Sequence, residues 1–171
     1  MYIKPAAPNT GINLQRTDLP GKPIVKADVD NVIETNRSTT IEANGARVGT
    51  IEHLMAALTG MQIDNALIEI NGEEVPILDG SSQHFIEHLA EVGVEKQNAK
   101  KIYYNIQHNI TFVDDEKKVE MVALPYNDYR INTLIDFNSP ILGTQHADMR
   151  NITDFKNELA PRRTFCFFHD L

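Results

Sequence analysis

The stretch that decides the fold is Thr50–Ser82, TIEHLMAALTGMQIDNALIEINGEEVPILDGSS. After its first residue, apolar side chains recur at the spacing of one helical face, at Ile51, Leu54, Met55 and Leu58. Thr50 suits the N-cap of this helix and Gly60 suits its C′ position. An alternating segment over residues 66–71 then predicts a strand. The stretch therefore predicts a helix followed by a strand.

A second helix is expected directly after this strand. Asp79-Gly80 closes a short apolar run, and Ser81 or Ser82 can cap a helix that continues to about Ala90 or Val92. Upstream, Ile12–Arg16 is typical of a strand and Asn44-Gly45 of a hairpin turn. Residues 1–97 thus predict one α+β domain, and its opening residues read as the end of a hairpin whose first strand is missing.

The pattern changes after a polar linker over residues 95–101. Strands are expected at residues 102–106, 110–113, 119–124, 129–137 and 163–168, with a short helix at 153–159. We interpret residues 98–171 as the beginning of a second, truncated α+β domain. The chain is accordingly expected to be a fragment or a short form of a longer protein.

Composition narrows the classes of function. The formal charge of −8 and the pI of about 5.2 disfavour binding to phosphate backbones, so no nucleic-acid partner is expected. No apolar run has the length of a transmembrane segment, and the first residues lack a signal-peptide pattern. Cys166 is the only cysteine, which excludes a disulfide framework and favours a cytoplasmic location.

Glu52 and His53 are the first candidates for chemistry. Adjacent helical residues point about 100° apart, so one can bind a metal while the other reaches a water on that metal. The positive end of the helix dipole favours an ionised Glu52. This pair suits metal-assisted hydrolysis. Taken alone, the dipeptide is more typical of a solvated acid beside a hydrogen-bonded histidine.

Two further pairs of polar residues are less specific. His84 and His88 share a helix face at a metal-compatible spacing, but the motif lacks the glutamate that follows the first histidine in zincins. His146 and Asp148 are expected in a polar loop. A surface role is the better interpretation of both pairs.

The segment Arg163–Phe167 alternates in polarity. Phe165 and Phe167 fall on one face of an extended strand, and Thr164 and Cys166 on the other. The pattern fits an ordinary core strand, or alternatively an apolar channel wall with a hydroxyl beside it.

Four blocks of this sequence resemble one enzyme family. Thr50–Ser82 closely resembles the UDP-3-O-acyl-N-acetylglucosamine deacetylase (LpxC) family, whose pattern is T-V-E-H-L, then G-I-D-N, then E-[IV]-P-I-[ML]-D-G-S-[AS]. Three other family blocks are resembled in the same order, by Lys4–Leu19, Ile135–Gln145 and Arg163–Phe167. The block Ile135–Gln145 is similar to Bacteroidetes members, in which the deacetylase is often fused to the FabZ dehydratase. The resemblance therefore also implies a possible C-terminal FabZ fusion.

The resemblance implies both a fold and a reaction. The fold is α+β, with two similar domains, each a two-layer sandwich of a sheet on helices like ribosomal protein S5 domain 2. The reaction is the zinc-dependent deacetylation of UDP-3-O-(hydroxyacyl)-N-acetylglucosamine in lipid A biosynthesis. It releases acetate and a free glucosamine amine.

The same resemblance implies roles for individual residues. Glu52 matches the general base and His53 matches the first Zn²⁺ ligand. Thr164 matches a threonine beside the zinc-bound water that helps to polarise the acetyl carbonyl. The implied substrate-binding residues are Phe165, Phe167 and Asp170.

Three family features have no counterpart in this sequence. An H-K-x-x-D motif, which carries two zinc ligands, is missing, as are the later catalytic histidine and the early G-L-H-T-G segment. Since a catalytic zinc site needs three protein ligands, this chain by itself is expected to be inactive and metal-free or weakly metallated. One alternative is a non-catalytic binding or folding module that has lost the active half. The other is a nucleic-acid-binding module on the related ribosomal-protein-like fold, which the net charge of −8 disfavours.

Overall fold

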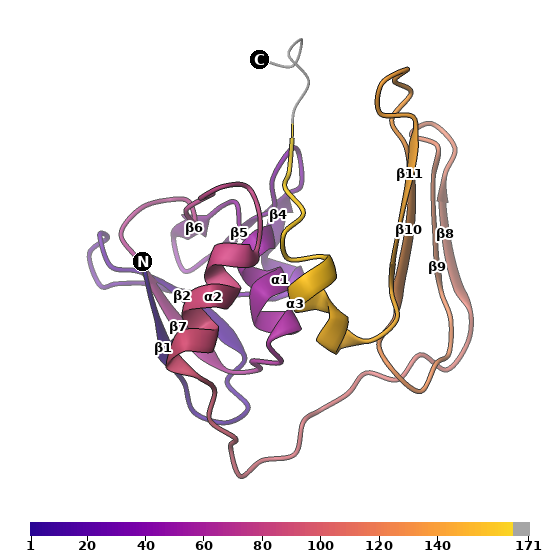
Figure 1. The fold of residues 1–171 in the computed structure, drawn as a ribbon. Helices are drawn as coiled ribbons and strands as arrows, with labels where there is room; N and C mark the ends of the chain where they lie inside the picture. Colours follow the sequence, from indigo (N-terminus) through magenta and orange to yellow (C-terminus); the bar gives the residue numbers. More distant parts are fainter. Residues whose placement is uncertain (166–171) are drawn as a thin grey trace. The chain divides into compact units, whose positions relative to one another are not determined.

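The computed structural model describes residues 1–165, which fall into two compact units (Figure 1). Unit 1 combines residues Met1–Ala99 with the described residues from Thr153, and unit 2 is Lys100–Ile152. The fold is mixed α+β, as the sequence predicts. The assignment of residues 98–171 to a second domain stays a prediction, because here residues 153–165 group with unit 1.

The main sheet of unit 1 joins strands that are far apart in the sequence. Its order is β1 (Tyr2–Pro5), β7 (Ala66–Ile70), β2 (Ile12–Arg16) and β3 (Ile24–Lys26). β7 runs antiparallel to β1 and parallel to β2, with Ile12 opposite Ala66. Buried residues alternate with partly exposed ones along β2 and β7, which confirms the period-two pattern of both segments.

A smaller antiparallel sheet follows along the chain. The short 3₁₀ helix η1 (Val29–Asn31) leads into β4 (Val32–Glu34), β5 (Thr40–Ala43) and β6 (Ala46–Val48). Asn44 and Gly45 form the predicted hairpin turn between β5 and β6, and both have positive φ. Positive φ at both central residues is the conformation that a tight hairpin requires.

Among residues 1–165, unit 1 holds three α-helices, namely α1 (Glu52–Gly60), α2 (Gln83–Val92) and α3 (Phe155–Glu158). The first two confirm the predicted helices. The last follows the 3₁₀ helix η2 (Ile152–Asp154). It lies within the segment 153–159 that the sequence predicts as helical.

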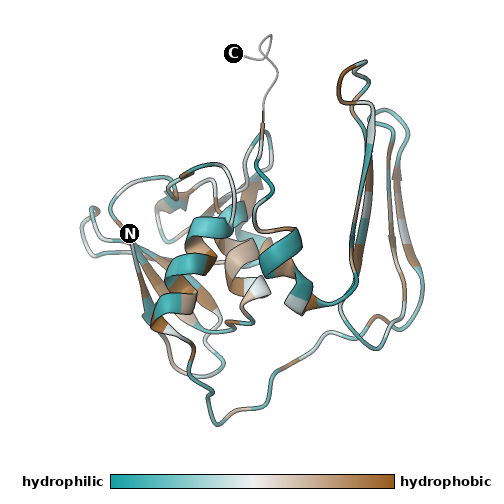
Figure 2. Ribbon diagram, in the orientation of Figure 1, coloured by the Kyte–Doolittle hydropathy of each residue, from teal (hydrophilic) through white to brown (hydrophobic). Residues whose placement is uncertain are grey.

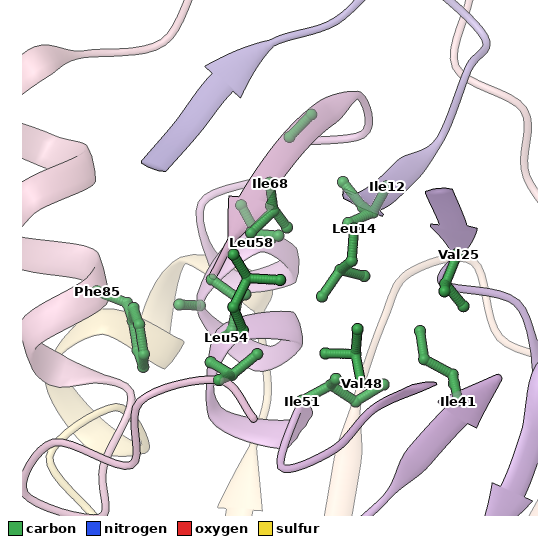
Figure 3. Close-up of a cluster of buried hydrophobic side chains, with 14 of the residues drawn as sticks. Ile12, Leu14, Val25, Ile41, Val48, Ile51, Leu54, Leu58, Ile68 and Phe85 are labelled. Atoms are coloured by element: carbon green, nitrogen blue, oxygen red, sulfur yellow. The ribbon is translucent and has the colours of Figure 1, made fainter. Parts of the chain in front are cut away.

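Both long helices share one core with the strands (Figure 3). Leu14 and Ile68 contribute from β2 and β7, Leu54 and Leu58 from α1, and Phe85 from α2. Each such side chain stabilises the fold by about 1.5–3 kcal/mol through removal from water. This packing fixes the orientation of α1 and α2, and therefore the direction in which their first turns face.

The ends of α1 differ from the prediction. Thr50 does not cap the helix: its φ is +59°, Ile51 is the N-cap, and no side chain caps the first turn. Gly60 is the last helical residue rather than C′, and Met61 is the C-cap. The close approach of Phe155 is the reason that a glycine stands at Gly60.

Unit 2 consists of two hairpins, whose ribbons carry both hydrophobic and hydrophilic residues (Figure 2). Many of its apolar side chains are exposed. One hairpin pairs β8 (Ile110–Asp114) with β9 (Val119–Ala123), and the other pairs β10 (Ile131–Asp136) with β11 (Thr144–Met149). The strand predicted at residues 102–106 is wrong, because these residues are not paired with another strand. His146 and Asp148 lie on β11 rather than in a loop.

Burial separates the two units sharply. Met149 is the one buried residue between residues 100 and 152, whereas unit 1 holds the whole buried cluster. Within residues 1–165, no helix has both the length and the apolar character needed to cross a bilayer.

Candidate functional site

The candidate site begins where the chain enters α1. The Gly49 N–H donates to the Glu73 carbonyl oxygen over 2.8 Å, and the Gly49 carbonyl accepts from the Val75 N–H over 3.1 Å. This parallel bridge ties the residue before Thr50 to the segment that leads to Asp79. The entry to α1 is therefore fixed by backbone pairing.

Thr50 carries backbone strain at this entry. Its φ of +59° lies in the left-handed region, which a β-branched residue rarely adopts. Such a conformation costs on the order of 1–3 kcal/mol and persists only where the surrounding structure holds it. Thr50 lies two residues before Glu52, so the backbone conformation that leads into the candidate site lowers the stability of the fold.

The Glu52 carboxylate is oriented by a backbone amide. Its Oε1 accepts a hydrogen bond from the N–H of Thr39, which lies just before β5. Glu52 is partly buried in the first turn of α1. A carboxylate held through one oxygen keeps the lone pairs of the other oxygen for proton transfer.

His53 is tied to the start of α2. The hydroxyl of buried Ser82 donates to the His53 carbonyl oxygen over 2.9 Å. This bond is one of the contacts that join the first turn of α1 to the residues just before α2. His53 as a whole is partly exposed.

The segment Asp79–Ser82, which we name the DGSS loop, is organised around one carboxylate. Asp79 Oδ1 accepts from the Ser81 N–H at 3.2 Å and from the Ser81 hydroxyl at 2.7 Å. The Ser81 hydroxyl bond, with help from the nearby His84 and Arg163 charges, lowers the pKa of Asp79 below its ordinary value. Ser81 Oγ also accepts from the N–H of Gln83, the first residue of α2, whereas Ser82 is the N-cap and makes no side-chain capping bond.

Thr164 contacts the same loop. Its N–H donates to the Gly80 carbonyl oxygen over 2.7 Å, and the neighbouring Arg163 Nε donates to Asp79 Oδ2 over 3.1 Å. The DGSS loop is thus bonded to Thr164 on one side and, through Ser82, to His53 on the other. The structure brings these two predicted residues to one loop.

The strand predicted over residues 163–168 is not formed in the part that the structure describes. Residues 163–165 are not assigned to a strand, and the side chain of Phe165 is exposed. The Thr164 N–H bonds to the Gly80 carbonyl of the DGSS loop. Phe167 and Asp170 lie outside the described residues.

The residues in place do not suffice for a zinc site. Among residues 1–165, no group of three histidine, cysteine, aspartate or glutamate side chains could hold an ion. His84 faces Glu87 at 3.2 Å and Asp79 at 3.7 Å, and His88 is exposed on α2. These two histidines fit the surface role predicted for them. His53 can offer one ligand, so Zn²⁺ does not fit the described residues by themselves.

Sequence reasoning missed three residues of this arrangement. The sequence predicts only a turn at Asp79, a cap at Ser82 and a helix end at Gly60. Their signal is present in the chain as the D-G-S-S run and the glycine at the end of a helix. What the sequence does not show is that residues from Phe155 onward return to contact all three.

Comparison with known proteins gives the chain a family. The family model described as UDP-3-O-acyl N-acetylglycosamine deacetylase (LpxC) matches residues 1–171. The chain is 42% identical to the bifunctional enzyme LpxC/FabZ of Bacteroides thetaiotaomicron, with 99% of this chain and 37% of that protein aligned. Its identity to the Chlorobaculum tepidum enzyme of the same name is also 42%, over 99% of this chain and 36% of that protein.

A relative named for the deacetylase alone shows the same similarity. The UDP-3-O-acyl-N-acetylglucosamine deacetylase of Syntrophotalea carbinolica is 41% identical over 100% of this chain and 55% of its own length. The chain therefore spans little more than a third of the bifunctional relatives and about half of this one. Because the family model covers every residue, the chain belongs to the UDP-3-O-acyl N-acetylglycosamine deacetylase (LpxC) family.

Proposed function

We propose that the protein acts in lipid A biosynthesis by hydrolysing the acetamide of UDP-3-O-(hydroxyacyl)-N-acetylglucosamine. The observation that carries this proposal is the DGSS loop, which is bonded to His53 and to Thr164 beside the first turn of α1. Membership of the deacetylase family supports the same reaction. The products are acetate and a free amine.

Each residue has a chemical task in this proposal. Glu52, held through one oxygen, takes a proton from the attacking water as the water oxygen bonds to the acetyl carbon. The Thr164 hydroxyl donates to the carbonyl oxygen while negative charge develops on it. The C–N bond then breaks, and the amine nitrogen takes up a proton. Phe165, Phe167 and Asp170 are proposed to contact the substrate.

Zinc enters this proposal through His53 alone. Zn²⁺, when bound, would supply Lewis-acid activation of water and carbonyl. His53 would be one of its ligands, and a catalytic site needs about two more from outside residues 1–165. No step of the reaction is therefore assigned to the ion here. We accordingly propose that residues 1–171 alone bind Zn²⁺ weakly and do not turn over substrate.

The finer predictions on fold, location and partners are also proposals. A core shared by the main sheet, α1 and α2 supports a two-layer sandwich like ribosomal protein S5 domain 2 for unit 1. The relatives named LpxC/FabZ support a fused FabZ dehydratase. A single cysteine supports a cytoplasmic location.

The test is a deacetylase assay on the complete gene product with the variant Glu52→Gln. The amide keeps an oxygen for the Thr39 N–H but cannot take a proton, so kcat should fall by about 10²–10⁴-fold. The matched control is Glu91→Gln on the exposed face of α2, which should keep kcat within about twofold. Full activity of the Glu52 variant would exclude this residue as the base. An inactive but folded wild-type protein would favour the non-catalytic module.

A further inference from the structure

Residues 153–165, which we name the strap, leave unit 2 and return to unit 1. After the short helix α3, residues 162–165 have no regular secondary structure. The position of Thr164 therefore depends on separate contacts rather than on a sheet or a helix. The structure offers three such contacts along the strap.

The first contact is between α3 and the end of α1. A Cβ placed on Gly60 would lie 2.1 Å from Cδ1, 2.7 Å from Cγ and 2.8 Å from Cε1 of Phe155. These distances are shorter than any real carbon–carbon contact between residues, so a side chain at Gly60 would displace the aromatic ring. The absence of a side chain at Gly60 thus leaves the space that the Phe155 ring occupies.

The second contact is at Ala160, whose side chain is buried in the core of unit 1. Its carbonyl oxygen accepts from the Ser82 N–H over 3.1 Å. The hydroxyl of the same serine donates to the carbonyl of His53. Ser82 therefore joins the strap to the first turn of α1 through two bonds of a single residue.

The third contact places Thr164 itself. Its N–H reaches the Gly80 carbonyl, and Asp79 receives the side chain of Arg163 directly beside it. Arg163 is largely exposed, so this ion pair adds little to global stability. Its effect is geometric, because it holds the backbone next to Thr164 against an ordered loop.

We propose that Gly60 and Asp79 are positioning residues for Thr164, which they hold against the DGSS loop through Phe155 and Arg163. This inference rests on the proposed catalytic role of Thr164. A catalytic hydroxyl displaced by about 1 Å can lose about 10²-fold in rate, so loosening either end of the strap should affect catalysis without removing a catalytic residue.

The first experiment measures amide hydrogen exchange of Thr164 by NMR in the 171-residue chain. Gly60→Ala and Asp79→Asn should each speed exchange of the Thr164 amide about tenfold or more. Each variant weakens the binding of the strap, so the hydrogen bond from the Thr164 N–H to Gly80 opens more often. Matched controls are Gly72→Ala, at a glycine with open space around it, and Asp30→Asn, at an exposed carboxylate. Both controls should stay within about twofold.

A double variant distinguishes a clash between residue 60 and the Phe155 ring from a general loss of fold stability. In a Phe155→Ala background, Gly60→Ala should change Thr164 exchange by less than about twofold, because the ring that it would strike is gone. Unchanged exchange at Thr164 in both single variants overturns the inference. An equal effect of Gly60→Ala with and without Phe155 overturns the part that concerns Gly60.

The second experiment uses the active complete enzyme. Gly60→Ala and Asp79→Asn should lower kcat about tenfold or more with KM within about twofold, and Asp79→Glu should recover part of the loss. Faster exchange at Thr164 with wild-type kcat overturns the positioning role. A wild-type enzyme that does not deacetylate the substrate instead refutes the proposed function, and the exchange data still decide whether Gly60 and Asp79 hold the strap.

Discussion

The Ser82 hydroxyl and the His53 carbonyl oxygen are joined by a hydrogen bond of 2.9 Å that links α2 to the first turn of α1. Ser82 is buried, so removal of its hydroxyl leaves the carbonyl without this partner. We expect Ser82→Ala to lower the free energy of unfolding of the chain by about 1–2 kcal/mol. Urea unfolding followed by circular dichroism measures the loss.

The matched control for this variant is Ser38→Ala, at a partly exposed serine before β5. It should change the free energy of unfolding by less than about 0.5 kcal/mol. Equal stability of Ser82→Ala and the wild-type chain would contradict the structural weight given to this bond.

Thr50 predicts a stabilising substitution. Asparagine tolerates positive φ better than a β-branched residue, so Thr50→Asn should raise the free energy of unfolding by about 0.5–1 kcal/mol. Thr59→Asn, at an exposed helical position in α1, is the control and should be neutral or slightly destabilising. A loss of stability for Thr50→Asn would show that the threonine side chain has a role that offsets the backbone strain.

Acid should weaken the contact between the strap and the DGSS loop. The pKa of Asp79 lies below its ordinary value of 3.8 because Ser81, His84 and Arg163 favour the charged carboxylate. Its contribution is therefore complete above pH 3.8 and is lost as the pH falls through the lower folded-state pKa.

The measurement is Thr164 amide exchange from about pH 5 to about pH 2.5, corrected for the intrinsic rate. Protection should fall with acid in the wild-type chain and stay flat with pH in Asp79→Asn. The same acid dependence in both proteins would assign the titration to another carboxylate.

The two units should also differ in local stability. Unit 2 is built from two-stranded hairpins and buries only Met149 among residues 100–152, whereas β2 and β7 lie within the core sheet. An isolated two-stranded pair is marginally stable in water. Amide exchange in β8–β11 should therefore be at least about 10²-fold faster than in β2 and β7. Similar protection in both units would mean that unit 2 is stabilised by something other than side-chain burial.

Local sequence patterns predicted the elements of unit 1 well. The boundaries of β2 agree residue for residue, and α1 and α2 lie where apolar residues recur at helical spacing. These predictions succeed because Leu54, Leu58 and Phe85 face one core, and the periodicity records that burial. The turn at Asn44-Gly45 succeeds because few residues accept two consecutive positive φ values.

Non-local contacts explain the failures. Thr50 is a residue type that often caps helices, but its φ is positive, and it directly follows Gly49, which pairs with Glu73 and Val75. Residues 163–165 alternate like a strand, yet Arg163 and Thr164 bond to the DGSS loop. For the site, Glu52 and His53 could be proposed from the sequence, but the link from His53 through Ser82 to the strap could not.

The return of the strap makes unit 1 discontinuous in sequence, which has a consequence for synthesis. Thr164 is made roughly 80 residues after Gly80, a delay of about 4–16 s at typical translation rates. During that interval the sheet, α1 and α2 can assemble, while Gly60 does not yet contact Phe155 and the Asp79 carboxylate is not yet paired with Arg163. The bond between Thr164 and Gly80 therefore forms only after unit 2 has been synthesised.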